Sequence, residues 1–204
     1  MKKEHDEYLV KKYPRLFRDR YKPMTETCMC WGFSHGDGWF NIIAALCGNI
    51  QHHIDWARKQ RAHNLQYNRC LKRALNGDTA GLIWFYTYGK GGPSDWTHKQ
   101  VAEAIASIKF REVPESVPQV VVDQVKEKFG TLRFYYHGGD ATIDGMVRMA
   151  EDMSGYTCEH CGVPAETKSN RGWVSTICSK CRRAMNARRK KEMEEYEKSN
   201  VQTA

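Results

Sequence analysis

The longest hydrophobic pattern in the chain has helical spacing and runs from residue 39 to residue 75. Its first half places a set of apolar residues on one stripe of a helix: Trp39, Ile42, Ile43, Leu46, Ile50, Ile54 and Ala57. Residues 58–64 are polar, and an apolar face resumes at Leu65, Leu71 and Leu75 before Asn76-Gly77 ends it. The pattern predicts one long helix or two helices with a joint. Its apolar faces would serve a folded single chain or a homodimer equally well.

Shorter patterns on both sides of this segment predict a mixture of helices and strands. Helices are expected at residues 4–12, 97–108 and 143–153, and buried strands at residues 27–33 and 82–88. A β-hairpin is expected from strands 120–128 and 131–136 around the turn Phe129-Gly130. Together these elements indicate an α+β fold, with an N-terminal α/β unit at residues 1–155 and a second module at residues 156–204.

Four cysteines in the second module have the spacing of a metal site. Cys158 and Cys161 form one C-x2-C pair, Cys178 and Cys181 form another, and sixteen residues separate the pairs. Two short clamps and a loop long enough to return allow four thiolates to surround one tetrahedral Zn²⁺ ion. Because four protein ligands leave no open position for water or substrate, we expect one structural zinc ion without a catalytic role.

The residues around the cysteines predict how this module folds. Gly162 follows the first pair, where a knuckle turn favours the positive φ of glycine. Residues 169–172 have turn composition, and residues 173–177 predict a returning strand. Residues 182–198 contain neither glycine nor proline and predict a basic helix that begins at the second pair. Knuckle, hairpin and helix in this order are typical of a treble-clef zinc finger.

Composition restricts the classes of function. The chain has 204 residues, and its longest apolar run, at residues 81–88, is too short for a membrane helix, which needs about twenty residues. The chain shows no secretory signal, so a reducing cytoplasm without membrane attachment is the expected environment. The cysteines outside the pairs lie in apolar stretches, where free cysteines are commonly inert packing residues: Cys28, Cys30, Cys47 and Cys70. Whether these cysteines have a role beyond packing stays open.

The net charge of +8 is distributed unevenly along the chain. Residues 168–191 hold nine lysines and arginines and no acid, whereas residues 140–166 hold six acids and one arginine. The predicted terminal helix carries basic residues that could bind the phosphates of DNA or RNA: Arg182, Arg183, Arg188, Arg189, Lys190 and Lys191. The alternative is a solvated helix with i,i+4 ion pairs: Arg188 with Glu192, Lys190 with Glu194 and Lys191 with Glu195.

A glycine turn before the long helix is a second candidate site. Its backbone amides would face an anion, and aromatic side chains nearby could stack on a nucleotide. The possible ligand pocket consists of Trp31, His35, Gly36, Asp37, Gly38 and Trp39. The alternatives are helix capping by Asp37 and core packing by the aromatic residues. Capping is favoured, because aspartate is a preferred N-cap and its charge opposes a phosphate.

The spacing does not specify a catalytic constellation. His35 and Asp37 flank Gly36, and His52 and His53 lie on the predicted long helix, but no pattern forces these groups into one pocket. A nuclease of the HNH type would carry paired histidines in the hairpin of the metal module, and residues 169–177 contain none. A non-catalytic role is therefore the preferred interpretation.

Several motifs together resemble one protein family. They are Tyr13-Pro-Arg-Leu-Phe17, Cys28-Met-Cys-Trp-Gly-Phe33, Gly36-Asp-Gly-Trp39, the hairpin at residues 124–136, Cys158-x2-Cys161 and Gly172-Trp173. The set is similar to small uncharacterised proteins of tailed bacteriophages and prophages that carry a C-terminal four-cysteine zinc finger, over most of residues 13–181. This resemblance implies expression in the cytoplasm of an infected bacterial host, and it implies no activity that can be assigned to individual residues.

Three functions follow from these observations. The leading hypothesis is a non-catalytic, phage-encoded zinc-finger accessory protein that binds nucleic acid or a host nucleic-acid machine. The second is an inhibitor that binds a host defence or regulatory protein, or sequesters a nucleotide signal, through the α/β unit. The third is a nuclease or nucleotide-processing enzyme that uses His35, Asp37 or the histidine pair.

Overall fold

The computed structural model describes residues 1–170 and 172–201, and the chain divides into two compact units. Unit 1 contains Met1–His52 and Pro118–Ala204, and unit 2 contains His53–Val117. The division falls inside helix α2 (Phe40–Ala74), which the hydrophobic pattern predicted as either one helix or two. It does not coincide with the boundary expected at residue 155, because the cysteine module belongs to unit 1.

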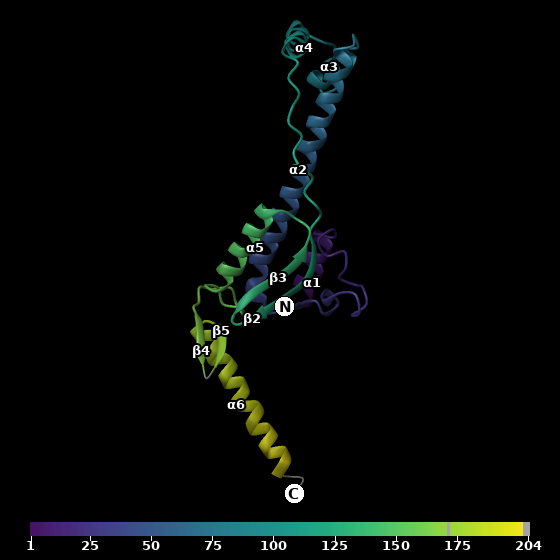
Figure 1. Cartoon of the computed structure of the whole chain (residues 1–204). Coiled ribbons are helices and arrows are strands. Elements are labelled where there is room, and N and C mark those ends of the chain that lie inside the picture. The colour runs from purple at the N-terminus through teal and green to yellow at the C-terminus, as the bar shows by residue number, and fades with distance from the viewer. Residues whose placement is uncertain (171, 202–204) are drawn as a thin grey trace. The chain divides into compact units, whose positions relative to one another are not determined.

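Unit 1 contains a three-stranded sheet in the order β1-β2-β3, of which Figure 1 labels β2 and β3. The short strand β1 (Phe33–Ser34) runs parallel to β2 (Val121–Lys128), and β2 runs antiparallel to β3 (Thr131–His137). Phe129 and Gly130 connect β2 to β3 with φ angles of 54° and 80°. Positive φ at both central residues is the requirement of a type I′ hairpin turn. The structure therefore confirms the predicted hairpin.

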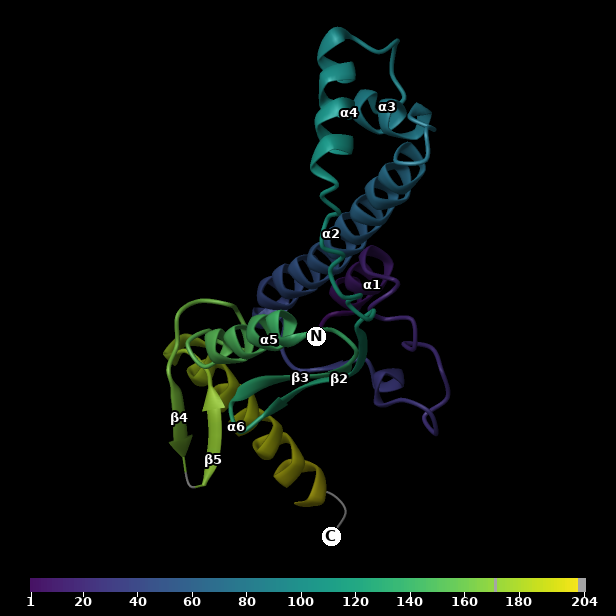
Figure 2. The same ribbon diagram turned by 45° about the horizontal axis from the view of Figure 1, so that its top comes forward.

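Helix α5 (Ala141–Ser154), predicted at residues 143–153, follows the outer edge of β3 (Figure 2). The amide of Leu132 donates to Ser154 Oγ at 2.8 Å. The amide of Phe134 donates to Glu151 Oε1 at 2.9 Å. An edge strand otherwise presents unpaired N–H groups, so these two side chains satisfy donors that the sheet leaves open.

The strand predicted at residues 27–33 is wrong for its first part. Residues 28–31 form the 3-10 helix η1 (Cys28–Trp31). Thr27 Oγ1 caps this turn by accepting a hydrogen bond from the Met29 amide at 3.0 Å. Gly32 then adopts a φ of 73°, which an extended strand does not allow. Only the two residues of β1 remain to pair with β2.

Helix α1 (Lys3–Lys12) forms where the polar pattern predicted it. Arg20 joins this helix to η1, because its Nη2 donates to Asp6 Oδ2 at 2.7 Å and its Nη1 donates to the Cys30 carbonyl at 3.1 Å. Within the part of the chain that the structure describes, no helix combines the length and the apolar character needed to cross a membrane.

Unit 2 packs the end of α2 against α3 (Ala80–Thr87) and α4 (Asp95–Ser107). Its buried core consists of Tyr67, Leu71, Ala74, Leu82, Phe85, Val101 and Ala104.

The helix at α4 was predicted, but the strand predicted at residues 82–88 is wrong because this segment is helical. Leu82 and Phe85, three residues apart, reach one core from the same side of a helix. A short continuous apolar run does not distinguish a strand from a buried helix by its periodicity.

A second small sheet and the terminal helix complete unit 1. Strands β4 (Thr167–Asn170) and β5 (Trp173–Thr176) pair antiparallel, and helix α6 (Ser179–Val201) follows them. The structure confirms the returning strand and the helix after the second cysteine pair. Ser169, which was expected in a turn, belongs to β4. Arg171, in the same predicted turn, lies outside the described residues.

Candidate metal centre and basic helix

The four cysteines of the C-terminal module come together at one point. The Sγ atoms of Cys158, Cys161, Cys178 and Cys181 lie within 4.8 Å of one another. Cys161 Sγ and Cys178 Sγ are 3.7 Å apart, and all four thiols are free of disulfide bonds. A tetrahedral site with zinc–sulfur bonds of about 2.3 Å would place its sulfurs about 3.8 Å apart. The cluster therefore fits around a metal ion, as the spacing predicted.

A tight knuckle presents the first cysteine pair. The Gly162 amide donates to the Cys158 carbonyl at 2.9 Å, and the Cys158 amide donates to the Val163 carbonyl at 2.8 Å. Thr157 and Pro164 close the base of the knuckle through a β-bridge. Gly162 has a φ of 76°, which glycine adopts without steric cost. The knuckle turn with a positive φ at Gly162, which the sequence predicted, is confirmed.

The second cysteine pair lies at the start of α6. The Arg182 amide donates to the Cys178 carbonyl at 2.9 Å, so Cys178 precedes the first helical turn and Cys181 lies within it. The Cys181 amide donates to Cys178 Sγ at 3.4 Å, and this hydrogen bond lowers the pKa of the Cys178 thiol to about 7. The Cys178 amide donates to Cys158 Sγ at 3.3 Å. The donor to Cys178 Sγ favours the thiolate form of Cys178, which is the form that binds metals.

The knuckle packs against the glycine turn that precedes α2. The Gly38 amide donates to the Glu159 carbonyl at 2.7 Å, and the Gly36 amide donates to Glu159 Oε1 at 2.9 Å. A Cβ atom on Gly38 would lie 2.0 Å from the Cys158 carbonyl oxygen and 2.5 Å from the Gly162 nitrogen. Such distances are too short for any Cβ contact. The close approach of two backbones is therefore what requires glycine at position 38.

These contacts change the interpretation of the possible ligand pocket. The amides of Gly36 and Gly38, expected to face an anion, donate to the knuckle. Trp39 is fully buried, and its Nε1 donates to the Thr157 carbonyl at 2.8 Å. Trp31, in η1, is 65% exposed. The glycine turn is thus a packing surface for the cysteine module. Trp39 is a core residue that connects the turn to this module.

Asp37 is the first residue of the 3-10 helix η2 (Asp37–Trp39), and Gly36 occupies its N-cap position. The prediction that Asp37 caps the helix is therefore wrong. Asp37 Oδ1 instead accepts a hydrogen bond from the Lys2 amide at 2.6 Å and lies 3.2 Å from His5 Nδ1. Although burial opposes ionisation, these contacts hold the pKa of Asp37 below its ordinary value. The carboxylate therefore joins the N-terminal segment to the glycine turn.

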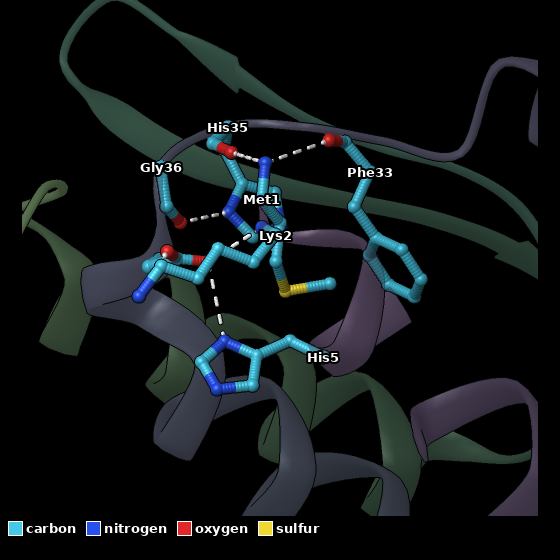
Figure 3. A network of polar contacts seen from close by, with 7 residues as sticks. Met1, Lys2, His5, Phe33, His35 and Gly36 are labelled. Carbon is cyan, nitrogen blue, oxygen red and sulfur yellow. Dashed lines mark hydrogen bonds and ion pairs between the residues drawn. The ribbon is translucent and has the colours of Figure 1, made fainter. Parts of the chain in front are cut away.

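His35 lies next to the N-terminal residue Met1 and is only 7% exposed. Its Nδ1 is 2.7 Å from the Gly36 carbonyl oxygen, and its buried Nε2 has no hydrogen-bond partner among the described residues. The amino group of Met1 donates to the carbonyls of Phe33 and His35 (Figure 3). Burial lowers the pKa of His35 from 6.5 to about 4. At neutral pH this imidazole is an uncharged core group and does not face an open site.

We expect the free energy of unfolding to fall as the pH decreases below 6.5. The unfolded chain takes up a proton at His35 near pH 6.5, whereas the folded chain does so only near pH 4. Burial outweighs the charges that face the ring, of which the Met1 ammonium disfavours and Asp37 favours protonation. Urea titrations should show that the natural chain loses about 1 kcal/mol more than a His35→Gln variant between pH 6.5 and 5.5. Equal losses would contradict a buried, neutral His35.

The other cysteines lie apart from the cluster. Cys47 is fully buried, and burial raises the pKa of its thiol, as an inert packing role predicts. Cys70 is partly buried against Gly81, and Cys30 is also partly buried. Cys28 is exposed, contrary to the packing role expected of it. Within the described ranges, the four-cysteine cluster is the one group of three or more ligating side chains that could hold a metal ion.

Helix α6 is exposed from Arg183 to Glu197. It carries the i,i+4 ion pairs that the sequence predicted: Arg188 with Glu192 at 2.7 Å, Lys190 with Glu194 at 3.8 Å and Lys191 with Glu195 at 3.8 Å. Such exposed pairs contribute at most about 1 kcal/mol each and are easily exchanged for another partner. Arg183 and Arg189 make no ion pair with any residue that the structure describes. The helix therefore carries both cations that are paired with glutamate and cations, Arg183 and Arg189, that have no acidic partner among the described residues.

Residues outside the predicted set also hold the module in place. The Glu159 amide donates to the Thr176 carbonyl at 2.9 Å, and Thr176 Oγ1 donates to the Gly130 carbonyl at 2.5 Å, at the tip of the β2–β3 hairpin. A Cβ atom on Gly130 would lie 3.1 Å from the backbone of Ser175. No spacing rule signals these partners, because they are distant in sequence and meet only in the folded chain.

Comparison with known proteins adds no assignment to this geometry. The resemblance to phage proteins accordingly stays a prediction from the sequence motifs. No protein-family model and no curated protein matches the chain, and no solved structure matches its fold.

Proposed function

We propose that the four-cysteine cluster binds one structural Zn²⁺ ion in a treble-clef finger, and that this finger presents α6 to nucleic acid. Four thiolates in a tetrahedral arrangement are a donor set typical of zinc. The order of knuckle, β4–β5 hairpin and α6 supports the treble-clef assignment. The bound ion would fix the start of α6 to the knuckle, because the two cysteine pairs come from these two elements.

The observation that carries the nucleic-acid proposal is the distribution of charge around α6. At 3.6 residues per turn, four cations fall within an arc of about 120°, and we call them the basic face: Arg182, Arg183, Arg189 and Lys190. Among these, Lys190 is the residue with an acidic partner in the described chain. Arg188 and Lys191 project from the other side of the helix, and both have glutamate partners. Arg182 donates to Ser175 Oγ at 3.3 Å, so Arg183 and Arg189 are the cations of this face best suited to contact a phosphate backbone.

A groove at the base of α6 extends this surface. It has a volume of about 800 Å³, and Tyr156, Lys168 and Arg182 are among the residues that line it. Tyr156 is 72% exposed, so its ring is free to stack on an unpaired base. Lys168 lies 3.4 Å from Glu166, but both side chains are exposed and the pair is weak. The groove therefore offers cations and an aromatic ring next to the basic face.

We expect an Arg183→Ala/Arg189→Ala variant to bind nucleic acid more weakly and with a lower salt dependence. Each phosphate contact with duplex DNA contributes about 0.9 to the slope of log affinity against log salt, so two lost contacts should reduce that slope by about 1.8. Fluorescence anisotropy with labelled single-stranded and duplex DNA and RNA, across a salt series, measures both quantities.

The matched control is an Arg188→Ala/Lys191→Ala variant. It removes the same charge from the same helix, but from the side where glutamates neutralise the cations. Its affinity and slope should stay close to those of the natural chain. Equal weakening in both variants would indicate a response to net charge alone, and no binding by the natural chain at low salt would overturn the nucleic-acid proposal.

The biological setting we propose follows from the resemblance to phage proteins. In that setting the chain acts in the cytoplasm of an infected bacterium as a non-catalytic accessory protein. Its nucleic acid would be free or part of a host nucleic-acid machine. Burial of His35 and the use of Asp37 as a structural contact support the non-catalytic interpretation.

A further inference from the structure

Unit 2 contains an open groove that is separate from the metal module. The groove has a volume of about 910 Å³, and α2, α3, α4 and the irregular segment of residues 109–114 contribute to its lining. This volume is within the range of small-molecule sites, about 300 to 1,000 Å³. Aromatic, cationic and amide side chains share the lining. Such a combination of flat apolar surface and a few polar groups is typical of ligand pockets.

The segment of residues 109–114 is attached to α2 through the backbone of Arg111. The Arg111 amide donates to Asn68 Oδ1 at 2.8 Å, and Asn68 Nδ2 donates to the Arg111 carbonyl at 2.8 Å. One residue further, Asn64 Nδ2 donates to the Glu112 carbonyl at 2.7 Å. Both asparagines lie on α2. The backbone of Arg111 is therefore fixed to a helix, although the segment itself has no regular structure.

Aromatic rings position the side chain of Arg111. Its guanidinium carbon is 4.0 Å from the centroid of the Tyr67 ring and 5.2 Å from that of Phe85. The guanidinium group makes no hydrogen bond or ion pair with a residue described in the structure. Arginine carries five N–H donors and keeps its charge at every physiological pH. Arg111 is thus a cation held in place by rings, with donors left for another group.

The other side chains that line the groove indicate which kind of ligand could supply a partner for the Arg111 guanidinium group. Lys109, which is exposed, adds a second cation, and the ring of Phe110 is 47% exposed. The hydroxyl of Tyr86 is neutral at pH 7, as for any tyrosine, and burial raises its pKa further, to about 12. Glu103 supplies a carboxylate that can accept hydrogen bonds from hydroxyl or amino groups.

We propose that this groove binds a small organic anion that carries a flat aromatic ring. Arg111 and Lys109 hold the anionic group, and Phe110 contacts the ring. Nucleoside monophosphates and aromatic carboxylates share this chemistry. The site goes beyond the proposed binding of nucleic acid by α6 and stands independently of it, because every residue in the argument belongs to unit 2.

Titration calorimetry with the full-length, metal-loaded chain tests the proposal. The probes are the four common ribonucleoside monophosphates, phenylpropionate, adenosine and inorganic phosphate. We expect a nucleotide or phenylpropionate to bind at least about tenfold more tightly than adenosine or phosphate alone, because only those probes combine the ring with the charge. The comparison of nucleotides with phenylpropionate identifies the source of the anion. Absence of binding by all of these compounds at millimolar concentration would overturn the proposal.

Variants test the assignment to Arg111. Arg111→Gln should weaken binding at least about tenfold, and Arg69→Gln, an exposed arginine of the same unit that does not line the groove, should leave it unchanged. If circular dichroism shows that Arg111→Gln unfolds unit 2, the exposed Lys109→Gln and Phe110→Ala variants take its place and should each weaken binding. Unchanged affinity in folded variants would contradict this site.

Discussion

Removal of the metal ion by a chelator is expected to unfold the cysteine module while the core of unit 2 stays folded. The proposed zinc ion joins the knuckle to the start of α6, and structural zinc contributes about 10 to 16 kcal/mol of apparent binding free energy in small fingers. Hydrogen exchange measured residue by residue should show that the Cys158 and Gly162 amides, which are hydrogen-bonded in the knuckle, lose protection. Amides in the helices of unit 2 should keep theirs, because the core of that unit consists of its own residues.

Cysteine variants provide the control for this expectation. Cys178→Ser removes one of the four clustered thiols and should abolish stoichiometric zinc binding, whereas Cys28→Ser changes an exposed thiol outside the cluster. Metal analysis of the purified proteins should find one zinc per chain in the natural protein and in Cys28→Ser. A full zinc equivalent in Cys178→Ser would contradict the proposed site.

A Gly38→Ala variant is expected to lose at least about 3 kcal/mol of stability, the upper end of the range for overpacking. The added methyl group would lie 2.0 Å from the Cys158 carbonyl oxygen, and this neighbour is backbone that cannot rotate away. Relief of the clash would move the knuckle from the glycine turn and break the hydrogen bond between Gly38 and Glu159. Because the knuckle carries two of the proposed ligands, zinc affinity should fall together with stability. Thermal unfolding and competition with a zinc indicator measure the two effects.

The matched control for Gly38 is Gly145→Ala. Gly145 lies inside α5, and a Cβ atom there would meet no heavy atom within 4 Å. Alanine is favoured over glycine inside a helix by about 0.5 to 1 kcal/mol, so this variant should be slightly more stable than the natural chain. If both variants were equally stable, the packing of the glycine turn on the knuckle would be wrong.

The accuracy of the sequence predictions depends on how local each feature is. The turn Phe129-Gly130 connects two strands with nothing else between them, so its identity was readable from a few neighbouring residues. The helix at α4 begins with a capping box in which Ser94 and Thr97 exchange hydrogen bonds, another local arrangement. The prediction of a strand at residues 82–88 was wrong because a continuous apolar run suits a strand or a buried helix equally well. The core that includes Leu71 and Val101 decides between them.

The candidate site divides in the same way. The sequence predicted the four-cysteine cluster, because each short clamp confines its two thiols and the residues between the clamps are enough for the pairs to meet. It did not show that the glycine turn faces the knuckle. Gly36 and Glu159 are 123 residues apart and share no periodic pattern. The amides of the turn were therefore interpreted as free for an anion when they were already used inside the protein.

By itself, the sequence determined the four-cysteine cluster, the hairpin turn, the basic helix and its i,i+4 ion pairs, since each follows from spacings within a short stretch of the chain. Only the tertiary structure decided that Gly38 must be glycine, that His35 is a neutral core group and that Arg111 is held by aromatic rings with its donors open. These properties arise from burial and from contacts between distant segments. No spacing along the chain encodes which surfaces will meet when such segments fold.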